Sequence, residues 1–216
     1  IRVGLHTFGS RFKTIDEINL ILCISRVPTS DRKGLIQYIA NFLNLNLDPW
    51  TNDFGQKLCK GDINILNKLS ENKIINYRKA LEFLEEQAKY LIYYSFYKKD
   101  IFIKEIEIIR NKDVFNIFLL QKDRYSYFKK IEKDIYNPII DSSISEKNSF
   151  ISSLNGSFIK SGPSGAPSRG KFEVLPTGKN FYSIDTRGIP TESAWFVGNQ
   201  SANQILDLFK QENGNN

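Results

Sequence analysis

The chain has 216 residues and a mass of 25.0 kDa, and 41% of its residues are hydrophobic, so it is long enough to bury a sizeable core. The net charge of +6 favours an acidic partner, but the basic residues are scattered, so we expect no nucleic-acid partner. Cys23 and Cys59 lie far apart, which gives neither a disulfide framework nor a zinc motif. No signal peptide opens the chain and no apolar run approaches roughly 20 residues, which predicts a cytoplasmic protein without a membrane span.

The chain contains no methionine and opens in what reads as an extended segment, so the sequence predicts a piece of a longer polypeptide. Apolar spacing and breaker residues predict a mainly helical region over 1–156. In chain order the expected helices cover residues 14–27, 33–43, 62–69, 72–98, 113–136, 146–154 and 191–210. A Thr14–Glu17 capping box would begin the first helix and a cap at Ser30 or Asp31 the second, and Pro138 would end the helix 113–136. Residues 100–109 fit either a helix or a strand, and short extended segments are expected near Val3 and Phe181.

The aromatic runs 90–97 and 125–128 lack the glycine alternation of nucleic-acid platforms. They are therefore predicted to belong to the core.

Residues 161–190 form the most unusual stretch, with five of the 13 glycines and four of the seven prolines. Val174, Leu175 and Phe181 are interspersed among them, and a solvated linker has little use for such side chains. A long segment without regular structure inside a domain is usually functional or disordered. We therefore expect an ordered loop within 157–216 that presents backbone amides and cations to an anionic ligand.

The segment GAPSRGKF (165–172) comes within one residue of the phosphate-loop pattern G-x-x-x-x-G-K-[ST]. Phe172 replaces the hydroxyl residue, Pro167 removes an amide, and no apolar strand precedes the loop. These departures predict that the chain does not hydrolyse ATP.

His6 is the only histidine, and it lies between Gly4 and Gly9, which leaves the backbone around it open. The alternatives are a structural histidine or a group that binds a metal or accepts a proton near neutral pH.

Arg169, Lys179 and Arg187 could form a solvated basic loop or converge on carboxylates. Asp185 beside Arg187 is either a structural ion pair or a base.

Four motifs together resemble a known family. They are GLHTFG (4–9), GPSGAPSRG (162–170), LPTGKNFYS (175–183) and PTESAW (190–195). In this order they resemble the large subunits of class I tetrapyrrole metal chelatases, and the glycine-rich run is most similar to that of the cobalt-inserting members.

The resemblance implies a metal chelatase, a ligase that forms nitrogen–metal bonds. The large subunit binds the tetrapyrrole and inserts Co²⁺ into hydrogenobyrinic acid a,c-diamide in cobalamin biosynthesis. ATP is hydrolysed by partners, an AAA+ ATPase and companion small subunits, and this fragment is expected to be inactive alone. The alternatives are insertion of Mg²⁺ into protoporphyrin IX, as in magnesium chelatase, and a tetrapyrrole-binding module without chelation.

The same resemblance suggests roles for particular residues. The expected substrate-binding residues are Arg169, Lys179, Arg187, Asn180, Gly162, Gly165, Gly170 and Gly178, where glycine lets the backbone approach the ligand. His6 would bind the metal or accept a proton, and Asp185 would accept a second proton, because insertion of M²⁺ releases two ring protons. Lys179 stands where arginine is commoner in the family, which weakens bidentate recognition there.

The expected fold is a mainly α fragment, with short β segments, of a larger α/β subunit. Its helical region is followed by the ordered glycine- and proline-rich loop and a closing helix.

Overall fold

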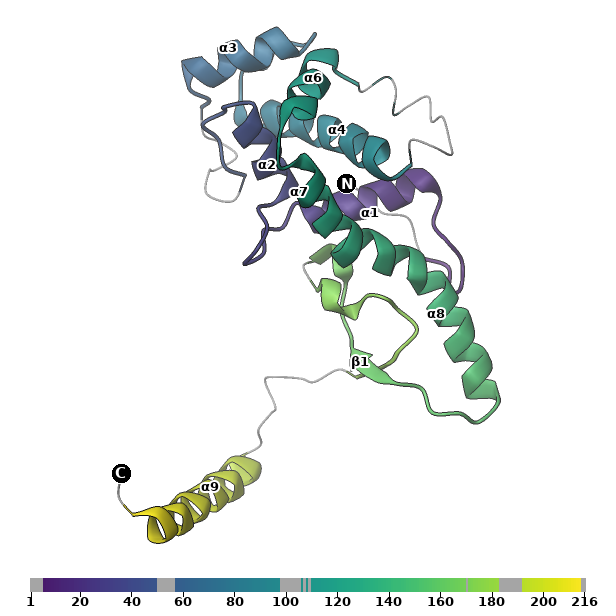
Figure 1. The fold of residues 1–216 in the computed structure, drawn as a ribbon, viewed down its shortest axis with the longest axis vertical. Coiled ribbons are helices and arrows are strands. Elements are labelled where there is room, and N and C mark those ends of the chain that lie inside the picture. Colours follow the sequence, from purple (N-terminus) through teal and green to yellow (C-terminus); the bar gives the residue numbers. More distant parts are fainter. Residues whose placement is uncertain are drawn as a thin grey trace. The chain divides into compact units, whose positions relative to one another are not determined.

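The computed structural model describes residues 6–49, 57–97, 106, 108, 110–169, 171–182 and 192–214. The chain divides into two compact units, Ile1–Asn180 and Phe181–Asn216. Helices dominate the described residues, which confirms the predicted mainly α class with short β segments (Figure 1). The division predicted between residues 156 and 157 stays a prediction.

The helices of the first unit are, in chain order, α1 (Thr14–Ser25), α2 (Leu35–Phe42), α3 (Lys60–Leu69), α4 (Tyr77–Phe96), α6 (Lys112–Leu120), α7 (Arg124–Ile131), the π-helical turn η1 (Glu132–Tyr136) and α8 (Asn137–Leu154). They are followed by strand β1 (Ser161–Pro163), the 3-10 turns η2 (Pro167–Arg169) and η3 (Phe172–Val174), and strand β2 (Asn180–Tyr182).

The ambiguous segment 100–109 is described only at Ile106 and Ile108, and both are helical. The expected extended segment near Val3 lies outside the described residues. The one near Phe181 is confirmed by β2.

Helix α1 is apolar on nearly every side and is buried accordingly. It packs against α4, η1 and η2, so it joins the helical core to the glycine-rich loop. Cys23 on this helix is buried, as predicted, and burial raises the pKa of its thiol.

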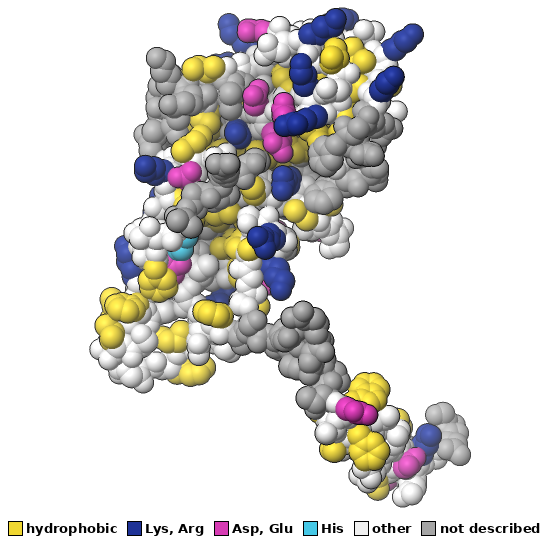
Figure 2. Space-filling view, turned by 180° about the vertical axis from the view of Figure 1, so that it is seen from behind, with side chains coloured by type: hydrophobic (Ala, Val, Ile, Leu, Met, Phe, Trp, Pro, Cys, Tyr) yellow, Lys and Arg dark blue, Asp and Glu magenta, His cyan; other side chains and the backbone are white. Residues whose placement is uncertain are grey.

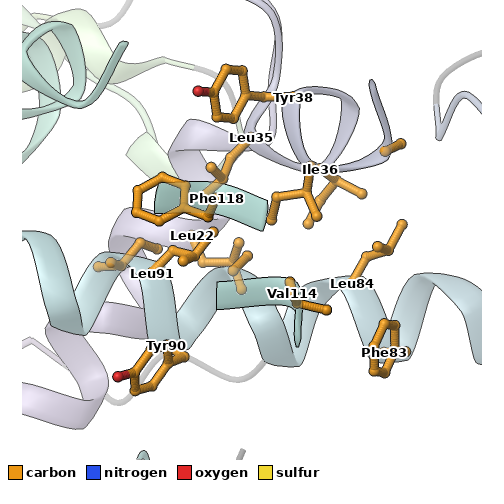
Figure 3. Close-up of a cluster of buried hydrophobic side chains, with 14 of the residues drawn as sticks. Leu22, Leu35, Ile36, Tyr38, Phe83, Leu84, Tyr90, Leu91, Val114 and Phe118 are labelled. Atoms are coloured by element: carbon orange, nitrogen blue, oxygen red, sulfur yellow. The ribbon is translucent and has the colours of Figure 1, made fainter. Parts of the chain in front are cut away.

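Side chains from α1, α2, α4 and α6 meet in one hydrophobic cluster (Figure 3). The aromatic run at the end of α4 belongs to it: Tyr90, Tyr93 and Tyr97 are buried, and Tyr94 and Phe96 are partly buried against it. The prediction of an aromatic core is therefore confirmed for this run.

The second aromatic run is divided. Tyr127 is buried and stacks on Tyr38 of α2 with ring centroids 3.9 Å apart, and Phe128 is buried beside it. Tyr125 is exposed, so it does not belong to the core as predicted.

Neither predicted cap at the first two helices is found. Lys13 occupies the cap position of α1 and makes no side-chain cap hydrogen bond, so the Thr14–Glu17 capping box is wrong. Helix α2 begins at Leu35 behind Gly34, whose amide donates to the Gln37 side chain at 2.9 Å, so a cap at Ser30 or Asp31 is also wrong.

Glu17 is instead buried in the core. Arg11 donates to its two oxygens at 2.6 and 3.0 Å, and the Tyr97 hydroxyl donates at 2.8 Å. The two bonds from Arg11, whose side chain is 52% exposed, are charge-assisted, and such bonds are stronger than those between neutral groups. They attach the segment that carries His6 to the core.

The predicted single helix 113–136 is wrong, and so is the break at Pro138. Gln121 adopts an extended backbone conformation that ends α6, and α7 begins after a short turn. The helical path then continues through η1 into α8, and the Asn137 amide donates to Glu132 O five residues back, the π-helical pattern. Pro138 lies in the first turn of α8, where a missing N–H is tolerated, and the predicted helix 146–154 is the second half of α8.

The loop after α8 folds back beside that helix (Figure 1). Strands β1 and β2 form a two-stranded sheet, and the Asn180 amide donates to Lys160 O at 3.0 Å. Val174 of η3 is buried, and Phe172 and Leu175 pack against the core cluster. These contacts attach the described part of this loop to the core.

The second unit contains α9 (Glu192–Asn213), where the sequence predicted the last helix. Its apolar side chains are exposed, including Trp195, Ile205 and Phe209. No helix among the described residues is both long enough and apolar enough to cross a membrane.

The core cluster predicts that alanine substitutions of two leucines change the free energy of unfolding by very different amounts. Leu84 on α4 is fully buried, whereas Leu120 at the end of α6 is 79% exposed. We expect Leu84→Ala to lower the free energy of unfolding by about 2–5 kcal/mol, because it removes buried methyl groups and leaves a cavity. Leu120→Ala should change it by less than about 0.5 kcal/mol in the same urea titration. Equal losses in the two variants would contradict the described core.

Candidate functional site

Glu146 of α8 lies at the centre of a cluster built from three separate segments. Its side chain is 2% exposed. His6 Nε2 lies 2.7 Å from Oε1 and 2.9 Å from Oε2. The Gly9 amide donates to Oε2 at 2.5 Å, and the Thr177 hydroxyl donates to Oε1 at 2.5 Å. The GLHTFG and LPTG motifs, which are far apart in the sequence, thus meet on one carboxylate.

The hydrogen bonds determine the charge of this carboxylate. Burial acts to raise the pKa of Glu146, but the bonds from Thr177, the Gly9 amide and His6 outweigh it, so the pKa lies below its ordinary value of 4.5. Glu146 is therefore an anion at neutral pH although it is almost completely buried.

His6 is oriented by this anion. Its Nε2 faces the carboxylate, so the hydrogen on Nε2 is the one donated, and the ring packs on Phe12 with centroids 4.9 Å apart. The side chain is 33% exposed, and Figure 2 shows histidine reaching the surface beside acidic side-chain atoms. No described residue hydrogen-bonds Nδ1. A histidine held in this way presents Nδ1 as a proton acceptor or a metal ligand.

Gly178 allows the LPTG segment to approach α8. Its φ is +91°, and an added Cβ would lie 2.7 Å from the Glu146 backbone nitrogen and 2.8 Å from its Cα. Next to it, the Thr177 amide donates to Ser142 Oγ at 3.0 Å, and Ser142 donates to Pro138 O at 2.8 Å. Only glycine fits this backbone contact, and the contact places Thr177 on Glu146.

A cavity of about 330 Å³ opens beside His6. Apolar side chains form most of its wall, and the polar residues are His6 and three hydroxyl residues. The lining residues are His6, Phe12, Leu20, Ile139, Ser142, Pro167, Ser168, Leu175 and Thr177.

A second hollow of about 460 Å³ is lined by Phe8, Phe150 and Phe158 and by Gly178, Lys179 and Asn180. Its phenylalanines are all more than half exposed. The expected site residues are thus divided, because His6 lines the first cavity while Lys179 and Asn180 line the second.

The remaining expected residues have different surroundings. Lys179 lies with its stem against Gly162, and its Nζ is 3.4 Å from Leu175 O, so this side chain also supports the loop. Gly165 lies against the stem of Lys171. Arg169, at the end of η2, is exposed.

Three predicted site residues, Gly170, Asp185 and Arg187, lie outside the described residues. Within the described part of the chain, no group of three His, Cys, Asp or Glu side chains could hold a metal ion.

Glu146 is the residue that sequence reasoning missed. In the sequence it is a single acid in a polar run, SSISEKNSF, which predicts only the start of a helix. Its burial depends on the fold of both flanking motifs, and no spacing rule connects them. The signal that pointed to the site was His6 in a glycine-bounded motif.

The close contact at Gly178 yields a test with a matched control. Gly156 also has a positive φ, +71°, but an added Cβ there would meet nothing within 4 Å. We expect Gly156→Ala to cost about 1–2 kcal/mol of stability from backbone strain alone. Gly178→Ala should cost about 1–3 kcal/mol more, because α8 must also move. Chemical denaturation of both variants measures this, and equal losses would show that the contact with α8 is unimportant.

The lowered pKa of Glu146 predicts how stability changes with pH. Its ionised form stabilises the fold above about pH 4.5, and that contribution is lost as the pH falls through the lower folded-state pKa. The stability difference between wild type and Glu146→Gln should therefore be largest near pH 7 and shrink below about pH 4.5. Glu82→Gln, at an exposed surface pair, should show a difference near zero throughout. A Glu146→Gln difference that does not depend on pH would contradict the buried anion.

Comparison with known proteins places these motifs in a family. The CobN/Magnesium Chelatase family model matches residues 1–216. The aerobic cobaltochelatase subunit CobN of Pseudomonas aeruginosa is 31% identical over 99% of this chain, which spans 16% of that protein. The H subunit of the magnesium chelatase of Chlorobaculum parvum is 41% identical over 32% of this chain and 5% of that protein.

The fold comparison agrees with the sequence comparison. The catalytic subunit of cobaltochelatase from Mycobacterium tuberculosis matches with a TM-score of 0.50 and 24% identity, over 99% of this chain and 15% of that chain. The chain thus spans about one sixth of the length of the relatives that it matches throughout. On the match along its whole length, the chain belongs to the CobN/Magnesium Chelatase family.

Proposed function

We propose that this chain is the part of a cobaltochelatase-type large subunit at which Co²⁺ is inserted into a tetrapyrrole. The proposal rests on the His6–Glu146 pair. The GLHTFG and LPTG motifs, which lie near the two ends of the first unit, hold this pair in place. The similarity to a cobaltochelatase subunit along nearly the whole chain supports the choice of reaction.

Insertion of a divalent metal releases two protons from the ring nitrogens, so the site needs proton acceptors. His6 Nδ1 accepts one of them, and the buried Glu146 anion stabilises the imidazolium that forms. Glu146 acts through His6 and is therefore a positioning residue. Asp185 is proposed as the second acceptor, from outside the described residues.

The metal is a substrate in this reaction, and His6 is also the group that would receive it. A histidine whose other ring nitrogen donates to a carboxylate has the arrangement common among metal-binding histidines. Imidazole nitrogen suits Co²⁺ better than Mg²⁺, which prefers oxygen ligands. This preference supports cobalt, while the similarity to part of a magnesium chelatase keeps Mg²⁺ insertion as the second candidate.

The basic residues of the loop would hold carboxylates at the edge of the ring. Arg169 is exposed and can form a bidentate pair, and Arg187 would act with it. Lys179 contacts loop carbonyls only at 3.4 and 3.5 Å, which leaves its ammonium able to bind an anion. The proposed binding surface is completed by Gly162, Gly165, Gly170, Gly178 and Asn180.

The energy for metal insertion would come from ATP hydrolysis by other subunits. The chain lacks a phosphate-loop hydroxyl at Phe172, so ATP hydrolysis belongs to an AAA+ partner and its companion subunits. The complete reaction accordingly requires the full-length large subunit with these partners.

The decisive experiment uses the full-length subunit with its ATPase partners. We expect His6→Ala to lower the rate of Co²⁺ insertion by about 10²–10⁴-fold, the usual contribution of a positioned acid or base. Tetrapyrrole affinity, measured by fluorescence quenching, should change less than about threefold, because proton transfer is a part of the chemical step and not of ring binding. Glu146→Gln should lower the rate less than His6→Ala does.

Thr7→Ala, next to His6 at an exposed position, is the matched control and should keep the wild-type rate. Wild-type insertion rates in His6→Ala would overturn the role of His6. A wild-type subunit that binds the ring but inserts neither Co²⁺ nor Mg²⁺ would favour the non-catalytic binding module.

A further inference from the structure

We propose that Thr177 is a positioning residue for metal insertion, whose hydroxyl holds the Glu146 carboxylate in the orientation that faces His6. This inference rests on the proposed function, in which Glu146 acts through His6. It adds the LPTG segment of the loop to the groups that control the reaction. Thr177 is assigned no contact with the reacting atoms and acts only through the carboxylate.

The orientation of the Glu146 carboxylate is set by donors on both of its oxygens. The Gly9 amide donates to Oε2 at 2.5 Å, and the Thr177 hydroxyl donates to Oε1 at 2.5 Å. The terminal torsion of a glutamate side chain is broad, so donors on both oxygens are needed to fix the plane of the carboxylate. In this orientation His6 Nε2 lies 2.7 and 2.9 Å from the two oxygens. Without the Thr177 donor, the carboxylate can turn about the remaining bond from Gly9 and away from His6.

Thr177 is held on α8 through its backbone as well as its side chain. Its amide donates to Ser142 Oγ at 3.0 Å, and Ser142 uses its own hydrogen on Pro138 O at 2.8 Å. Ser142 and Glu146 lie four residues apart, so they share one face of the helix. An ionised carboxylate can only accept, so the hydroxyl hydrogen of Thr177 points at Glu146. Two bonds to one helix face therefore fix where this hydroxyl lies.

Thr177 is also the donor that a substitution removes most cleanly. The bond from Gly9 is made by its backbone amide, and His6 is itself the proposed proton acceptor. Thr177→Val replaces the hydroxyl by a methyl group and keeps the β-branched shape that restricts χ1. Thr177→Ser does the opposite, because it keeps the hydroxyl and removes the methyl group.

The test measures kcat and KM for Co²⁺ insertion into the tetrapyrrole by the full-length subunit with its ATPase partners. We expect Thr177→Val to lower kcat by about 10- to 100-fold, the usual cost of removing a group that orients a metal-binding histidine from behind. KM for the ring should change less than about threefold, because the loss falls on the chemical step. Thr177→Ser should recover most of the lost rate.

The His6→Ala background separates positioning from a purely structural role. Because Thr177 acts through His6, adding Thr177→Val to His6→Ala should lower kcat by less than about a further twofold. A general loss of fold would instead slow both backgrounds by the same factor. A displacement of the loop that carries Lys179 and Asn180 would raise KM.

Thr29→Val is the matched control. Thr29 also donates its hydroxyl to a carboxylate, that of Asp31 at 2.8 Å, but Asp31 is exposed and lines neither of the two cavities described above. This variant should keep the wild-type kcat.

Ser142→Ala is a second variant for the case that Thr177→Val does not fold. It removes the acceptor of the Thr177 amide and keeps the hydrogen bonds of Glu146. Thr177 is then held less firmly, and we expect kcat to fall by about two- to tenfold, the worth of one ordinary hydrogen bond.

Three results would overturn the positioning role and leave the His6 proposal intact. They are a wild-type kcat in Thr177→Val, or in Ser142→Ala where that variant replaces it, a raised KM with an unchanged kcat, and an equal loss in the His6→Ala background. Wild-type insertion rates in His6→Ala, or a wild-type subunit that inserts no metal, would overturn the proposed function and this inference with it.

Discussion

The arrangement of the site depends on one buried carboxylate. Moving an isolated carboxylate out of water costs several kcal/mol, which only hydrogen bonds or opposite charge can offset. Glu146 receives these bonds from His6, the Gly9 amide and Thr177. Because the donors belong to two distant motif segments, the requirement to satisfy one anion brings both segments onto α8.

The helical core provides the rigid frame that this cluster needs. The buried Glu17 accepts hydrogen bonds from the exposed Arg11 and from the buried Tyr97, and these bonds attach the N-terminal segment to the core. On the other side, the π-helical turn η1 joins α7 to α8 without a break, so α8 starts within the core and carries Glu146 outward. Two buried carboxylates thus hold the N-terminal segment: Glu17 attaches it to the helical core, and Glu146 attaches it to the site.

In its described part, the glycine-rich loop makes several close structural contacts. Gly178 permits a backbone contact with α8, and the stems of Lys171 and Lys179 cover Gly165 and Gly162. A loop built this way presents Ser168 and Thr177 to one cavity and Lys179 and Asn180 to another. The described lining residues of the first cavity include no lysine or arginine, whereas those of the second include Lys179, so the two cavities are chemically different surfaces.

The sequence alone determined the helical class and the burial of the aromatic run on α4, and it identified His6 as a candidate site residue. Apolar periodicity and motif residues are local signals, so they can be read without the fold. It misjudged Glu17 and Pro138, where a tertiary partner and a π-helical turn overrode local preferences. It also missed Glu146, whose role exists only after two distant motifs fold onto α8. Local patterns specify which segments become helices. Only the tertiary structure decides which donors reach a buried charge, because these donors come from segments that no sequence periodicity relates.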